Sequence, residues 1–230
     1  MKRILFVILS FSLSTSLFAY DCEPKNKKEE RLLELGFQEL TDEFMDLIEG
    51  GVNPNVCDAH KSSLINIASF WNQTKMVSYL VSYSKADVNF ADELGWSPLA
   101  LAVFRGNFII VNLLLKAPLL KFEQIIPQGH NLFHICANTN PGPNDIRIAE
   151  KLMVRATPIL LNSKNARGFT PLHFAIKRNK IKLVNLLLET KMNDLNMKSP
   201  QGNSYVEFAR EEKLEEIALA IELFIEATKH

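Results

Sequence analysis

Apolar positions recur along the chain in short blocks of one form: apolar, variable, apolar, small. The blocks are Ile65–Ala68, Leu99–Ala102, Phe133–Cys136, Leu172–Ala175 and Val206–Ala209. Their final small residues lie 34, 34, 39 and 34 residues apart. A period of this length that persists over several blocks is typical of repeat architectures, in which each unit packs only against its neighbours.

When the blocks are aligned, other positions of the alignment, here called columns, recur with the same spacing. Glycine recurs at positions 95, 129, 168 and 202, and a valine or alanine lies nine residues beyond four of the small positions. The pattern therefore predicts that each unit consists of a turn, a first helix, a short loop, a second helix and an extended segment that returns to the next turn. The interval of 39 contains extra residues between Asn138 and Arg147, including Pro141-Gly142-Pro143.

Cap residues mark the ends of the first helices. Ser97-Pro98 and Thr170-Pro171 each pair an N-cap hydroxyl with a proline whose fixed φ suits a first helical turn. The sequence therefore predicts helices that begin at Pro98 and Pro171. Three units follow the first helix with a residue that tolerates the left-handed conformation, namely Asn72, Gly106 and Asn179.

These units resemble the ankyrin repeat, whose period is roughly 33 residues. Thr170–Ala175 matches the family's Thr-Pro-Leu-His signature, and Gly51–Asn55 and Lys85–Asn89 resemble its Gly-Ala-Asp-Val-Asn return. Two units depart from the pattern, with Lys61 at the turn glycine and Asn131-Leu132 in place of Thr-Pro.

The resemblance covers about residues 28–230 and implies an all-α solenoid of about five to six helix-turn-helix units with short β-like turn fingers. The predicted units are about 28–57, 58–91, 92–125, 126–164, 165–198 and 199–230. Polar residues on the first and last units suit the exposed ends of such a stack.

The start of the chain is typical of a bacterial secretory signal peptide. Met1-Lys2-Arg3 is followed by an apolar stretch from Ile4 to Ala19, 16 residues that span about 24 Å as a helix. This is short of the roughly 30 Å core of a bilayer, so a permanent membrane span is the weaker interpretation. We expect residues 1–19 to be the signal peptide and 20–27 an N-terminal tail, with the mature chain periplasmic or secreted.

Charge and composition narrow the partners. The 230 residues hold 26 basic and 26 acidic side chains, and removal of the signal peptide leaves a formal charge of −2. This near-neutral net charge does not indicate nucleic-acid binding. No segment after the signal peptide is long and apolar enough to span a bilayer. We therefore expect a protein partner, no nucleic acid, no stable membrane span and a monomeric chain.

No constellation of catalytic residues is present in the sequence. There is no phosphate-binding Gly-Lys-Ser/Thr loop, no Gly-x-Ser-x-Gly elbow and no His-Glu-x-x-His helix. A site from His130, His134 and Cys136 fails as a metal centre, because positions two apart on a helix point away from each other. The sequence predicts a protein that is not an enzyme and has no cofactor or metal.

His134 and His173 occupy the signature histidine column. We expect each imidazole to bond the turn backbone of a neighbouring unit rather than a ligand. Cys136 stands in the small, buried column and is predicted to act as a small hydrophobe. In an exported chain, Cys22 and Cys57 are then the remaining intramolecular pair. The alternative is a flexible tail in which Cys22 is free or bound to another chain.

Partners of the family dock on the concave face, which turn tips and first-helix ends form. Alignment of the units places Phe70, Phe104, Lys177 and Glu211 in one column and Trp71, Arg105, Arg178 and Glu212 in the next. Aromatic residues and arginine are enriched at binding hot spots. The hypothesis assigns partner binding to Phe70, Trp71, Trp96, Phe104, Arg105, Phe169 and Arg178. The alternative is that the phenylalanines pack between first helices and that the tryptophans have no binding role.

A basic corner lies between the helices of the fifth unit, at Lys177, Arg178, Lys180 and Lys182. It either meets an acidic partner or pairs with the glutamate-rich last unit, and we favour the second because adjacent repeats place such corners side by side.

The sequence thus predicts an exported, non-catalytic protein-protein interaction module that binds its partner through the concave face. Two alternatives remain open. One is a regulatory or inhibitory subunit of an envelope enzyme or toxin, and the other is an exported effector that acts on a host protein.

Overall fold

The computed structural model describes residues 22–83, 85–139 and 142–228. The predicted signal peptide, residues 1–19, and the first two residues of the predicted tail lie outside the described residues.

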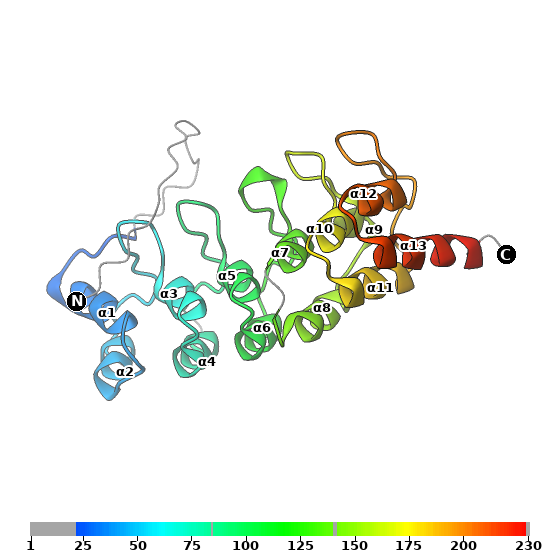
Figure 1. Ribbon diagram of the computed structural model, residues 1–230. Helices are drawn as coiled ribbons and strands as arrows, with labels where there is room; N and C mark the ends of the chain where they lie inside the picture. Colours follow the sequence, from blue (N-terminus) through cyan, green and yellow to red (C-terminus); the bar gives the residue numbers. More distant parts are fainter. Residues whose placement is uncertain (1–21, 84, 140–141, 229–230) are drawn as a thin grey trace.

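Helices stack in two parallel rows that run the length of the molecule (Figure 1). The inner row comprises α1 (Lys27–Gly36), α3 (Leu64–Phe70), α5 (Pro98–Phe104), α7 (Leu132–Asn138), α10 (Pro171–Lys177) and α12 (Tyr205–Glu211). The outer row comprises α2 (Asp42–Glu49), α4 (Thr74–Ser82), α6 (Phe108–Leu115), α8 (Asp145–Met153), α11 (Ile181–Glu189) and α13 (Glu215–Ala227). No strand occurs among the described residues, so the predicted all-α solenoid is confirmed.

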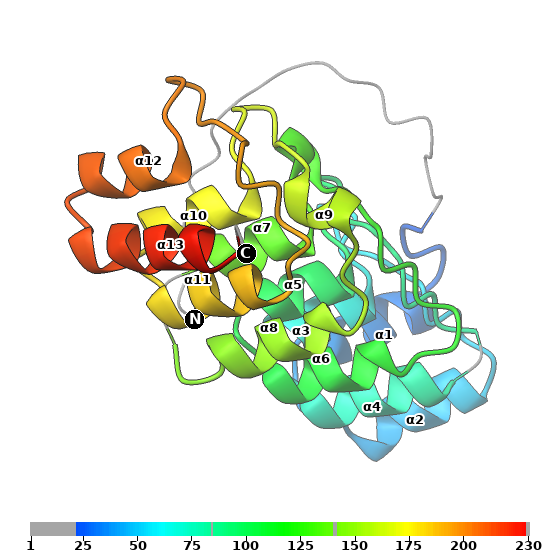
Figure 2. The same ribbon diagram turned by 90° about the vertical axis from the view of Figure 1, so that its right-hand side faces the viewer.

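The fourth unit departs from this regularity. Its return contains a short additional helix, α9 (Pro158–Asn162), which is absent from the predicted pattern of two helices per unit (Figure 2). Thr157 caps α9, since its Oγ1 accepts a hydrogen bond of 3.3 Å from the backbone N–H of Leu160. The loop between its inner and outer helices covers 139–144, whereas the corresponding loop of the third unit covers only 105–107.

The predicted caps and left-handed positions are confirmed. The hydroxyl of Ser97 accepts a hydrogen bond of 3.2 Å from the Ala100 N–H, and α5 begins at Pro98 as expected. Helix α10 begins at Pro171 behind the Thr170 cap. The φ angles of Asn72, Gly106 and Asn179 are 60°, 69° and 52°. Each of these residues ends an inner helix in the left-handed region.

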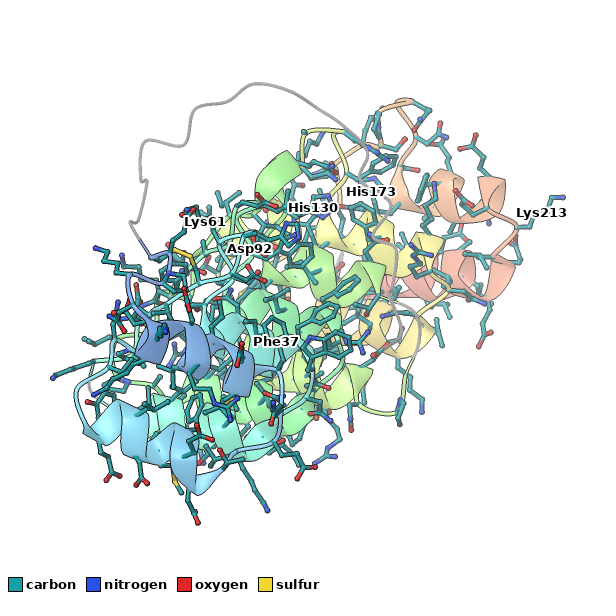
Figure 3. The ribbon with its side chains drawn as sticks, turned by 90° about the vertical axis from the view of Figure 1, so that its left-hand side faces the viewer. Phe37, Lys61, Asp92, His130, His173 and Lys213 are labelled. Atoms are coloured by element: carbon teal, nitrogen blue, oxygen red, sulfur yellow. A yellow bond between two sulfur atoms is a disulfide. The ribbon has the colours of Figure 1, made fainter. Side chains whose placement is uncertain are left out.

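A finger, meaning the tight turn that precedes each inner helix from α3 onward, projects on the inner-helix side (Figure 1). In the third unit its base is closed by the Asp92 N–H, which donates to the Trp96 carbonyl oxygen at 3.1 Å. Glycine holds a positive φ at this turn in other units, but Lys61 adopts a φ of 58° in the second (Figure 3). For a residue with a Cβ, this left-handed conformation costs about 1 kcal/mol relative to the right-handed region.

The small-residue column lies at the centre of the molecule. Its members, Ala68, Ala102, Cys136, Ala175 and Ala209, are all buried in one continuous apolar core. Burial raises the pKa of the Cys136 thiol to about 12, so this group stays protonated and behaves as a small apolar side chain, as predicted.

Asparagine side chains link the returns of successive units. Asn55 donates through Nδ2 to the Lys85 carbonyl at 2.8 Å and accepts at Oδ1 from the Asp87 N–H at 2.7 Å. Asn89 and Asn162 make the same two bonds to the units that follow them, at 2.7–2.8 Å. One side chain therefore satisfies a backbone acceptor and a backbone donor in each linked return.

Cys22 and Cys57 form a disulfide with a Cα–Cα distance of 5.3 Å. The two residues pack with Phe90 in a small buried cluster of their own. The Cys57 N–H also donates to the Cys22 carbonyl at 2.9 Å. The segment before α1 is thus held against the turn that precedes α3.

The two signature histidines behave differently. Nε2 of His134 lies 3.0 Å from the carbonyl oxygen of Phe169 in the next finger, as predicted. The prediction is wrong for His173, whose Nε2 is buried without a hydrogen-bond partner in the described structure. Its ring centroid lies 4.4 Å from that of Tyr205, which stands where the third and fifth units have proline. Burial is the main cause that lowers the pKa of both imidazoles to about 4.

The His134 shift predicts acid sensitivity. Between pH 6.5 and about 4 the unfolded chain binds a proton at His134 that the folded chain does not, so stability falls as pH falls. Replacement of His134 by glutamine should reduce the slope of the unfolding free energy against pH by about 1.4 kcal/mol per pH unit in this window. Urea denaturation followed by circular dichroism at several pH values measures the slope.

Asp92, whose pKa burial raises to about 6, contributes the opposite slope in both proteins and cancels in the comparison. His60 provides the control, because it is exposed and its hydrogen bond to Glu93 raises its pKa. His60→Gln should not flatten the curve. Parallel curves for wild type and His134→Gln would contradict the prediction.

Candidate functional site

Two adjoining hollows lie between the fingers and the inner helices, on the concave face of the solenoid. The apolar hollow, about 320 Å³, is lined by Leu94, Trp96, Phe104, Ile126, Gln128, His130, Ile135, Asn138 and Thr139. The polar hollow, about 620 Å³, is lined by Phe104, Arg105, Gly106, Asn138, Thr139, Gly142, Pro143, Asn144, Asp145 and Arg178. They meet at Phe104 and at the end of α7.

Four predicted aromatic residues form two ring pairs, and the pair of Trp96 and Phe104 belongs to the lining of the hollows. Phe70 and Trp71 form an edge-to-face pair with centroids 5.3 Å apart, and Trp96 and Phe104 form another at 5.4 Å. Trp71 is 49% exposed and Phe104 is 47% exposed. Phe104 is therefore not buried between inner helices, whereas Phe70 is partly covered by Arg105. We call Phe70, Trp71, Trp96, Phe104 and Arg105 the concave cluster.

Arg105 is held in place by Phe70. Its guanidinium carbon lies 4.8 Å from the centre of the Phe70 ring, and its Nε donates to the Phe70 carbonyl at 3.1 Å. Arg178 is anchored in the same manner, since its Nε donates to Oδ1 of Asn138 at 3.0 Å. Both arginines reach back to the preceding unit through Nε.

Phe169 lies apart from the concave cluster. Its ring is 5.8 Å from His173, 5.9 Å from Phe174 and 6.0 Å from Phe208, measured between centroids. The residue therefore packs where the fifth finger meets α10 and α12, and it lines neither hollow.

Lys180 supports the wall of the polar hollow from inside. Its side chain is only 4% exposed, and Nζ lies 2.8 Å from a carboxylate oxygen of Asp145. The same Nζ donates to the Cys136 carbonyl and to Oγ1 of Thr139, both at 2.9 Å. The ammonium is thus fully occupied by groups of the fourth unit.

This arrangement corrects one prediction about the basic corner. Lys177 does meet the last unit, at 3.9 Å from Glu212. Lys180 instead faces the preceding unit, and so does Arg178. Lys180 does so because it lies at the start of an outer helix. Asn107 holds the equivalent position in the third unit, and its side chain also donates to the preceding unit, at 3.0 Å to the Ser69 carbonyl.

Sequence reasoning missed several residues that shape the hollows, among them His130, Asn138 and Thr139. The available signal was the longer loop of the fourth unit, whose Gly142 and Pro143 line the polar hollow. Burial and the nearby Arg167 lower the pKa of His130, so this ring is neutral at pH 7 and adds no charge to the apolar hollow. Figure 3 shows His130 between Asp92 and His173 along this side of the molecule.

No group of three or more His, Cys, Asp or Glu side chains is placed to hold a metal ion in the part of the chain that the structure describes. Within the same residues, no helix combines the length and apolar character needed to cross a bilayer.

Two family models match the chain: "Ankyrin repeats (3 copies)" over residues 37–124 and "Ankyrin repeats (many copies)" over residues 153–209. The putative ankyrin repeat protein YahD of Escherichia coli is 30% identical over 73% of this chain and 82% of its own length. The chain belongs to the ankyrin repeat family. Since ankyrin solenoids present extended concave binding surfaces, it is a protein-protein interaction module.

Two further similarities are to a longer protein and to a solved structure. Human transient receptor potential cation channel subfamily A member 1 is 30% identical over 67% of the chain, but the chain spans only 14% of that channel. A solved chain from the complex of the Bdellovibrio bacteriovorus predatory endopeptidase Bd0816 with the immunity protein Bd3460 superposes with a TM-score of 0.69. It covers 82% of this chain and 96% of its own length at 21% identity, which shows a shared fold.

The buried Lys180–Asp145 pair yields a stability prediction for this ankyrin-repeat protein. Lys180→Met leaves the Asp145 carboxylate, 18% exposed, without its cation, so the free energy of unfolding should fall by about 3–5 kcal/mol. The double variant Lys180→Met/Asp145→Leu should recover most of this loss, because it removes both charges. Urea denaturation measures each variant.

Lys177→Met is the matched control. Its pair with Glu212 is exposed and 3.9 Å long, and such pairs contribute less than about 1 kcal/mol. A double variant that stays as unstable as Lys180→Met alone would show that the pairing of charges is not what stabilises this wall.

Proposed function

We propose that this ankyrin-repeat protein is exported and acts without catalysis, holding a protein partner on the concave cluster and the two hollows beside it. The observation that carries the proposal is the exposure of Trp71 and Phe104, each about half exposed, next to a pre-positioned arginine. Partly exposed aromatic side chains beside an arginine have the composition of binding hot spots.

A second candidate function is a regulatory or inhibitory subunit that covers an envelope enzyme or toxin. It is favoured by the fold similarity to a chain from a complex between an endopeptidase and an immunity protein. The binding surface is the same in both proposals. They differ in whether the partner's activity changes when it is bound. An exported effector acting on a host protein is the third proposal.

Export is supported by two features of the chain. The first 19 residues have the layout of a signal peptide. The Cys22–Cys57 disulfide is of a kind that persists in oxidising compartments and is rare in the cytosol.

Affinity capture tests the concave surface. Tagged wild type and Trp71→Ala/Arg105→Ala are used to recover partners from envelope and culture-medium fractions. Because both changes remove hot-spot side chains, the double variant should recover at least about tenfold less of the specific partner. Ile109→Ala/Lys116→Ala, which removes one exposed apolar and one exposed basic side chain from the outer-helix side, should recover as much as wild type.

Partners retained in full by the concave variant would contradict the proposal. When a recovered partner is an enzyme, its activity is assayed with and without the purified ankyrin-repeat protein. A change in activity that the concave variant fails to produce supports the regulatory function over simple binding.

Cell fractionation with mass spectrometry tests export. The mature chain should be found outside the cytosol without residues 1–19, with one alkylatable thiol, Cys136, after unfolding without reductant. A full-length cytosolic chain with three alkylatable thiols would contradict both export and the disulfide.

A further inference from the structure

The polar hollow carries unbalanced positive charge. Three ionised side chains line it: Arg105, Arg178 and Asp145. The single carboxylate among them is already paired with the buried Lys180 at 2.8 Å. The wall therefore neutralises its own acid, and no ion pair is recorded among the described residues for the two arginines that line the hollow.

Both guanidiniums are held in place by the protein. Each uses Nε for a bond to the preceding unit, Arg105 to the Phe70 carbonyl and Arg178 to the Asn138 side chain. The structure records no further hydrogen bond or ion pair for either group among the described residues. The terminal nitrogens, which form the edge that binds a carboxylate in bidentate fashion, are thus available and pre-oriented.

An apolar compartment adjoins this charge. The apolar hollow shares Phe104, Asn138 and Thr139 with the polar hollow, and its other walls include Trp96, Ile126 and Ile135. A ligand that fills both must carry an apolar side chain next to acidic groups. A nucleic acid strand fits poorly, because the next unit continues the same two columns with the exposed Glu211 and Glu212, which repel a polyanion.

We infer that the occupant is an acidic segment of a protein partner, whose carboxylates pair with Arg105 and Arg178 while a neighbouring apolar side chain packs against Trp96 and Phe104. The inference rests on the proposed function, since it assigns the partner chemistry of the same concave face. Charge complementarity here sets which segments bind, and the aromatic walls supply apolar contact.

A random peptide library displayed on phage and sorted on the immobilised protein tests this chemistry. Enriched peptides should place Asp or Glu beside a large apolar residue. A fluorescein-labelled peptide made from the enriched sequence is then titrated by anisotropy. Arg105→Gln/Arg178→Gln should weaken its binding at least about tenfold, because truncation of hydrogen-bonded charges leaves the partner carboxylates unpaired.

Lys116→Gln/Lys151→Gln is the matched control, because it changes the net charge equally at exposed positions of the outer-helix layer. Its affinity should stay within about twofold of wild type, and added salt should weaken wild-type binding more than that of the arginine variant. Circular dichroism melting establishes that both variants are folded. The same peptide with glutamine in place of its acids should bind like the arginine variant.

Several outcomes overturn the inference. They are enrichment of peptides without acids, failure to enrich any peptide, equal affinity in the two charge variants, or tight binding of a fluorescent single-stranded DNA oligonucleotide. Neutral peptides whose binding Trp96→Ala or Phe104→Ala abolishes would defeat the acidic-segment inference and leave the proposed function standing. Peptides indifferent to every concave substitution would count against both.

Discussion

Close packing of successive inner helices through one column of small buried residues is the constraint on which the molecule depends. Ala68, Ala102, Cys136, Ala175 and Ala209 hold the same place in five units and are all buried. A unit of this kind cannot cover its own apolar face and is stable only against its neighbours. Asparagine side chains add a second, polar link between units, because each one bonds backbone groups in the return of the following unit at 2.7–2.8 Å.

Interruption of this regularity in the fourth unit creates the candidate site. The loop 139–144 is longer than its counterparts, and Thr139 stands in the column that carries arginine in the units on either side. A smaller side chain at that place leaves room between Arg105 and Arg178, and Gly142 and Pro143 line one side of the space. The buried pair of Lys180 and Asp145 stabilises the floor while cancelling its only acidic charge. Affinity for a carboxylate and stability of the wall thus arise from neighbouring side chains.

Much of the concave cluster could be predicted from the positions that recur in every repeat. The exposed Trp71 and the position of Arg105 beside aromatic rings follow from alignment of the units. Phe169 illustrates the limit, since its column is a turn tip but its side chain packs onto the neighbouring rings of α10 and α12. A column specifies a place on the unit, whereas the direction of a side chain depends on its rotamer and on what surrounds it.

The sequence by itself determined the helical solenoid, the helix starts at Pro98 and Pro171, and the left-handed residues that end three inner helices. These are properties of neighbours along the chain, which local propensity and period encode. Only the tertiary structure decided that Lys180 turns to the fourth unit and that two hollows join at Phe104. It also decided that His173 packs on the ring of Tyr205 and does not make the predicted hydrogen bond to a neighbouring finger. Those outcomes depend on contacts between residues about one repeat apart or more, and on an insertion that breaks the period.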